Sequence, residues 1–237
     1  MTKEAFAQRR LWFAERLAVY ARRISPLRPL LTAGFVSDLR RLNDALCGTN
    51  LHGCYWVWSG LLLGWAREGT VLPHDSLDAD FAVLDCDFWR LAEAVPALEK
   101  AGFRCYRRFL NNDGEVTEVA FMRHGARFEF FRMFPDDGRL KYFLYGSENG
   151  QPLELRASLP DQPTTPFDFV GRTWLRHDDH ELELRSMYGS WEIPDPSWSF
   201  LSSLDIEAKR PWLRSDWWWR GGAAALADER PIAPDLI

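Results

Sequence analysis

The stretch SGLLLGWAREGTVLPHDSLDAD, residues 59–80, is the part of this sequence that decides the fold. The run before it, 53–58, is aromatic and β-branched, which is typical of a buried strand. We expect Ser59 to cap a short helix over 61–68, because serine is a favoured N-cap residue. Residues 78–84 are predicted to form the next strand, so a strand, a helix and a second strand follow one another closely.

Two aspartates begin that second strand. On a strand, Asp78 and Asp80 project to the same face of the sheet. Two carboxylates that share a buried face cannot both stay ionised without a compensating cation. Mg²⁺ is commonly held by one or two carboxylates together with phosphate oxygens and water. The pair therefore predicts a site for Mg²⁺ or Mn²⁺ that also receives a phosphate-bearing substrate.

The junction at Ser59-Gly60 supplies a second feature. Free backbone N–H groups at a strand-to-helix junction bind phosphate well. A phosphate site that shortly precedes an Asp-x-Asp pair is the arrangement of a nucleotidyltransferase-type active site. Glu129 adds a third acid, as metal ligand or as base, if the phenylalanines on either side of it face the core. The alternative is a glutamate on the solvent face of a half-buried strand.

Other polar residues are candidates with a plain structural alternative. Arg67 could hold a phosphate or form a salt bridge, and Lys141 could bind a phosphate or simply be solvated. His74 follows a proline in the loop that enters the acidic strand, where it could contact substrate or lie on the surface. The HDDH run at 177–180 could be a metal cluster, but we expect instead that the aspartates favour a helix N-terminus and that the histidines are exposed.

The remaining patterns predict an α+β domain with a mixed β-sheet flanked by helices. Helices are expected at 4–23, 33–47, 86–101 and 178–188, an antiparallel meander at 103–110, 115–123, 126–134 and 139–145, a loop at 150–166 and a strand at 167–176. We divide the chain into a helical N-terminal extension (1–50), a catalytic domain (51–200) and a Trp-rich tail that packs on the domain (201–237).

Composition excludes several classes of protein. The chain has 237 residues with 14% aromatic residues, which is too many for a disordered protein. Its net charge of −5 disfavours binding of nucleic acid. No apolar stretch reaches the ~20 residues that a membrane span needs, although the basic helix at 4–23 could contact a membrane surface. With no secretory signal in the sequence, we expect a cytoplasmic protein.

These motifs together resemble a known family. Residues 60–67 (GLLLGWAR), the Pro73-His74 pair and Asp78-Ala-Asp80 are similar to the signature of the LicD/fukutin phosphotransferases. The FEFF run at 128–131 resembles a later acidic strand of that family, and Leu184, Tyr188-Gly189, Trp191 and Pro194 resemble its final motif. The resemblance covers about residues 53–200.

The sequence also departs from the family pattern. Leu61 stands where the family often has threonine, and Glu129 replaces the usual aspartate. An additional residue between Pro73 and Asp78 leaves the role of Asp75 open.

The resemblance implies a nucleotidyltransferase-like fold and a metal-dependent transfer. A phosphocholine- or phosphoalditol-like group would pass from a CDP-linked donor to a hydroxyl of a sugar or another small acceptor, with release of CMP. Asp78, Asp80 and Glu129 would hold the metal. Two alternatives stay open: a nucleotidyltransferase that uses an NTP on a small molecule or a protein, and a non-catalytic binding protein that retains the fold.

Overall fold

The structure, a computed structural model, describes residues 28–72 and 77–213 together with the isolated positions Arg10 and Leu17. Apart from those two positions, the helix predicted over 4–23 lies outside the described residues, as do His74 and the chain beyond 213. No helix within the described residues is long and apolar enough to cross a membrane.

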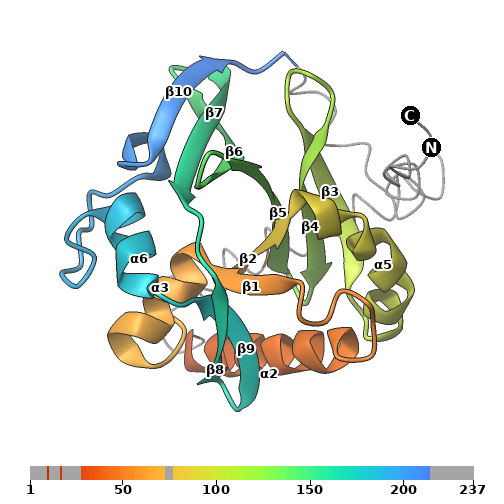
Figure 1. The fold of residues 1–237 in the computed structure, drawn as a ribbon. Helices are drawn as coiled ribbons and strands as arrows, with labels where there is room; N and C mark the ends of the chain where they lie inside the picture. The colour runs from red at the N-terminus through yellow and green to blue at the C-terminus, as the bar shows by residue number, and fades with distance from the viewer. Residues whose placement is uncertain (1–9, 11–16, 18–27, 73–76, 214–237) are drawn as a thin grey trace.

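An eight-stranded mixed sheet forms the centre of the molecule (Figure 1). One path through it runs β1-β2-β5-β6-β7-β10, while β4 also pairs with β5 and carries β3 beyond it. The strands are β1 Tyr55–Trp58, β2 Asp78–Leu84, β3 Arg104–Leu110, β4 Val116–Arg123, β5 Ala126–Asp136, β6 Arg139–Glu148, β7 Gln151–Pro160 and β10 Ile206–Pro211. The predicted α+β class and the meander from β3 to β6 are confirmed.

Strands β2 and β5 are parallel neighbours at the middle of this sheet, whereas the other described pairs of the sheet are antiparallel. Their register places Asp78 beside Arg127 and Asp80 beside Glu129. Because side chains alternate along a strand, all four project to one face of the sheet.

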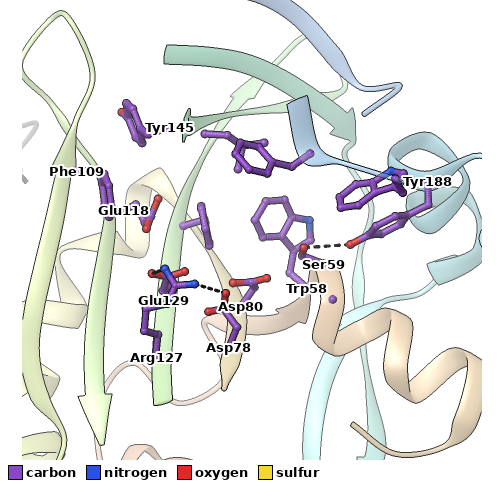
Figure 2. A pocket seen from close by; sticks show the side chains of 15 residues that line it. Trp58, Ser59, Asp78, Asp80, Phe109, Glu118, Arg127, Glu129, Tyr145 and Tyr188 are labelled. Carbon is purple, nitrogen blue, oxygen red and sulfur yellow. Dashed lines mark hydrogen bonds and ion pairs between the residues drawn. The ribbon is translucent and has the colours of Figure 1, made fainter. Parts of the chain in front are cut away.

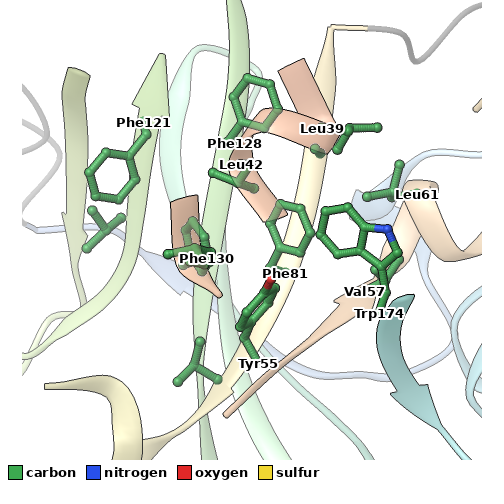
Figure 3. Packing of buried hydrophobic residues seen from close by; sticks show 14 of the residues in the cluster. Leu39, Leu42, Tyr55, Val57, Leu61, Phe81, Phe121, Phe128, Phe130 and Trp174 are labelled. Carbon is green, nitrogen blue, oxygen red and sulfur yellow. The ribbon is translucent and has the colours of Figure 1, made fainter. Parts of the chain in front are cut away.

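The helices α2 (Arg28–Leu46) and α5 (Arg90–Lys100) pack on the opposite face (Figure 1). Phe81, Phe128 and Phe130 are fully buried there, and the ring of Phe128 packs 5.7 Å from that of Phe35 on α2 (Figure 3). The helices are α2 Arg28–Leu46, α3 Ser59–Glu68, α4 Asp85–Phe88, α5 Arg90–Lys100 and α6 His180–Tyr188, followed by a 3₁₀ turn at Phe200–Ser202. The apolar alternation thus directs the acids of β2 and β5 away from α2 and α5.

The loop predicted at 150–166 is wrong. Most of it is the strand β7, and its end begins a hairpin of β8 (Thr164–Phe169) and β9 (Arg172–His177), so the single strand predicted at 167–176 is also wrong. The prolines suggested a loop, but those at 152 and 160 lie near the ends of β7, where strands tolerate a missing N–H group. The turn of the hairpin has positive φ at Val170 and Gly171.

Candidate active site

A cavity of about 370 Å³ opens over the acidic face of the sheet (Figure 2). Strands β2, β3, β4, β5 and β6, the start of α3 and the region from the end of α6 to residue 200 all contribute to its wall. Its lining residues are Trp58, Ser59, Gly60, Asp78, Asp80, Phe109, Glu118, Arg127, Glu129, Phe131, Leu144, Tyr145, Tyr188, Trp198 and Phe200.

Three carboxylates meet on the floor of the cavity. Asp78, Asp80 and Glu129 each offer an oxygen, and these oxygens all lie within 4.8 Å of one another. The parallel register of β2 and β5 produces this cluster, because it sets Asp80 directly beside Glu129. Carboxylate oxygens at this spacing are ligands of the kind that Mg²⁺ and Mn²⁺ prefer.

Arg127 neutralises part of this charge. Its guanidinium lies 2.5 Å from Asp78 Oδ2 and 3.2 Å from Glu129 Oε1. The other oxygen of Asp78, Oδ1, is buried and accepts no hydrogen bond from the described residues. Burial raises the pKa of Glu129 to about 8, against the opposing effect of Arg127, and the carboxylate of Asp78 adds to the rise. The buried Asp78 Oδ1 without a hydrogen bond from the described residues and the carboxylate of Glu129, whose charged form is destabilised, are groups that a divalent cation would stabilise.

Glu118 on β4 is a fourth acid that the sequence analysis missed. It lines the cavity and is only 5% exposed. Since Ala120 pairs with Glu129, Glu118 projects from the same face of the sheet. Burial, and after it the carboxylate of Glu129, raises the pKa of Glu118 well above its usual range. Glu118 is the one charged residue in the run 116–122, and this was the sequence signal that could have revealed it.

The start of α3 borders the three carboxylates. Trp58 pairs with Asp80 across β1 and β2, so Ser59 and Gly60, which follow it, line the same cavity as the acids. The N-cap prediction for Ser59 is wrong: Trp58 holds that position, and Ser59 is the first helical residue with a left-handed φ of 53°. The Ser59 hydroxyl instead lies 3.2 Å from the hydroxyl of Tyr188, in hydrogen-bond contact.

Comparison with known proteins agrees with this geometry. Residues 53–173 match the family model described as LicD/FKTN/FKRP, nucleotidyltransferase domain. The chain belongs to this family. No curated protein and no solved structure matches it. Membership of the LicD family indicates a transferase of the phosphotransferase type, and the matched region contains the start of α3 and all four acids of the cavity.

The LicD-type glycine at position 64 has a packing reason. A Cβ atom added there would lie 2.7 Å from the carbonyl oxygen of Thr70 and 3.0 Å from the backbone nitrogen of Leu72. Only glycine therefore lets the segment after α3 fold back tightly against the helix before it reaches β2.

Two predicted substrate contacts lie away from the cavity lining of this LicD-family chain. Arg67 donates hydrogen bonds to the carbonyl oxygens of Trp191 and Ile193, which ties α3 to the segment after α6. Lys141 pairs with Asp136. Neither side chain lines the cavity, and His74 lies outside the described residues.

The histidine prediction for 177–180 is partly wrong. Asp179 caps α6 as expected, because its carboxylate accepts a hydrogen bond from the backbone N–H of Leu182 at 3.0 Å. His177, expected to be exposed, is buried instead, with Nδ1 2.7 Å from the buried carboxylate of Glu183 and its ring 4.8 Å from that of Trp56. The pair joins β9 to α6.

Proposed function

We propose that this LicD-family protein transfers a phospho-alcohol from a CDP-linked donor to a hydroxyl acceptor and releases CMP. The observation that supports this most is one cavity that contains both the start of α3 and the Asp78, Asp80 and Glu129 carboxylates. A helix start binds the diphosphate of a nucleotide, and the acids bind the metal that accompanies it.

The three carboxylates would hold Mg²⁺ or Mn²⁺. Such an ion neutralises charge that develops on a diphosphate during transfer. Arg127 already lies between Asp78 and Glu129, so its guanidinium keeps the carboxylates together and can contact a phosphate oxygen. Backbone N–H groups at Ser59 and Gly60 would bind the other phosphate oxygens.

The transfer needs no reactant besides the donor and the acceptor. The acceptor hydroxyl oxygen forms a bond to the distal phosphorus while the bond from that phosphorus to the bridging oxygen breaks. CMP leaves with the electron pair of the broken bond, and the hydroxyl proton passes to a carboxylate of the cavity.

A donor screen tests the proposal. The protein is incubated with Mg²⁺ or Mn²⁺ and with CDP-choline, CDP-ribitol, CTP or ATP, and the released product is identified. Release of CMP from a CDP-linked donor is the expected result. Pyrophosphate from CTP or ATP would show a nucleotidyltransferase instead, and a protein that binds a nucleotide without turnover would be a binding protein. Asp80→Asn serves as the inactive control.

The location and partners belong to the same proposal. A cytoplasmic protein would reach CDP-linked donors directly, and a net charge of −5 gives no reason to expect nucleic acid as a partner. Peripheral contact with a membrane would suit an acceptor that is attached to a lipid.

A further inference from the structure

The cavity has two arms on opposite sides of the acid cluster. The strand order β1-β2-β5-β4-β3 places the start of α3, which follows β1, at one end and Phe109 on β3 at the other. Figure 2 shows Ser59 and Tyr188 on one side of Asp80, and Phe109, Glu118 and Tyr145 on the other side. The first arm has the helix start that suits a nucleotide diphosphate. The second arm, with Phe109, Glu118 and Tyr145, has no ligand in the proposed function.

In-line transfer gives the second arm a purpose. The attacking oxygen and the leaving oxygen lie roughly opposite each other across the transferred phosphorus. If the CMP part of the donor occupies the α3 arm, the acceptor must approach from the side of Glu118. This step rests on the proposed function.

The second arm has a rigid aromatic wall. The rings of Phe109 and Tyr145 are nearly parallel, with centroids 5.3 Å apart, and Trp212 packs against both at 5.9 and 4.4 Å. The indole of Trp212 donates a hydrogen bond to the carbonyl oxygen of Leu110 at 2.9 Å, and the Tyr145 hydroxyl lies 2.6 Å from that of Thr117. Because these contacts fix the rings, the wall loses little entropy when a ligand covers it.

Glu118 places one polar group beside that wall. It is the direct cross-strand partner of Phe109, and both residues line the cavity. Glu118 is buried and shares its face of the sheet with Glu129, so packing alone does not favour an acid here. A carboxyl group can hydrogen-bond to a hydroxyl in either protonation state.

We propose that Phe109, Tyr145 and Glu118 form the acceptor subsite, which receives the sugar acceptor that membership of the LicD family already suggests. A sugar ring offers an apolar C–H face to the aromatic wall and a hydroxyl to Glu118, which matches a wall with one convergent polar group. The hydroxyl that Glu118 holds is the one that faces the acid cluster, and therefore the one that attacks phosphorus.

Saturation-transfer difference NMR tests this subsite without knowledge of the natural acceptor. The probes are CMP with Mg²⁺ and a panel of methyl glycosides of glucose, galactose and N-acetylglucosamine. We expect at least one glycoside to bind together with CMP. Phe109→Leu and Glu118→Ala should each weaken glycoside binding by about tenfold, a loss of about 1.4 kcal/mol, and should weaken CMP binding much less. Phe143→Leu is the matched control, because Phe143 lies on β6 outside the cavity lining.

The outcomes separate the two proposals. Binding of CMP without any glycoside, or glycoside binding that survives both substitutions, would overturn the acceptor subsite and leave the proposed function standing. Failure of CMP to bind with Mg²⁺ would count against the proposed function itself. Circular dichroism tests whether each variant folds. If one of the two subsite variants fails to fold, the other still tests the subsite.

Discussion

Four carboxylates and one guanidinium share a single cavity, and in the proposed function a bound metal offsets the excess negative charge. Asp78, Asp80 and Glu129 lie within 4.8 Å of one another, and Glu118 is buried beside them. Such a cluster stabilises no part of the fold by itself. A substitution that removes one of these carboxylates should therefore lower activity without lowering stability.

Asp80→Asn is expected to lower transfer by about 100-fold or more, because the charge stabilisation that a bound metal supplies is worth several kcal/mol. The melting temperature should stay the same or rise, since one of three mutually repelling carboxylates is removed. Turnover of a CDP-linked donor and thermal denaturation measure the two effects. The exposed Asp161→Asn is the control, and an active Asp80→Asn enzyme would refute the metal assignment.

Asp205 gives a pH dependence away from the cavity. Burial raises its pKa to about 7, and its carboxylate accepts a hydrogen bond from the Ser203 hydroxyl. Between pH 4 and 7 the unfolded state loses this proton while the folded state keeps it, so stability falls as pH rises, by at most about 1.4 kcal/mol per pH unit. Asp205→Asn should flatten this fall in urea denaturation measured at several pH values. A slope that matches the parent protein would assign the titration to another group.

At the scale of elements, alternation predicted the strands well and proline misled. Phe128 and Phe130 face the core and direct Glu129 to the cavity, as the sequence indicated. The prolines near the ends of β7 suggested a loop, because proline has no N–H group to donate in a sheet. The sequence alone does not show that the pairing of β7 leaves these two positions without need of an N–H group. Glu118 escaped notice because no face could be assigned to β4 before its pairing with β5 was known.

The turn after α3 depends on Gly64. Gly64→Ala should lower the free energy of unfolding by about 1–3 kcal/mol, because the new methyl group would lie 2.7 Å from the carbonyl oxygen of Thr70 and the backbone must shift. Gly34→Ala in α2 is the matched control. Nothing lies within 4 Å of a Cβ at that position, so alanine should stabilise the helix by about 0.5–1 kcal/mol. Equal effects in urea denaturation would contradict the packing reason for Gly64.

At the scale of the whole molecule, the cavity is closed by parts of the chain that are far apart in sequence. Ser59 contacts Tyr188 across 129 positions, and Arg67 holds the carbonyl oxygens of Trp191 and Ile193. The rings of Tyr188 and Trp198 then pack 4.5 Å apart at the cavity wall. Local patterns predicted the elements that carry these residues, but such pairings depend on the tertiary fold and could not be predicted from one sequence.

The segment that closes the cavity packs against Gly146 on β6 through Phe200 and Leu201. A Cβ there would lie 3.0 Å from the side chains of Phe200 and Leu201, and both can move because only the ends of flexible side chains are involved. Gly146→Val should therefore displace Phe200 at the cavity wall and raise the KM for the donor several-fold. It should cost about 1 kcal/mol of stability, the low end of the range for overpacking, because the side chains it meets can move. Gly48→Val, where nothing lies within 4 Å of an added Cβ, should leave the KM unchanged. A Gly146→Val enzyme with the parent KM would show that the segment around Phe200 covers the cavity without shaping it.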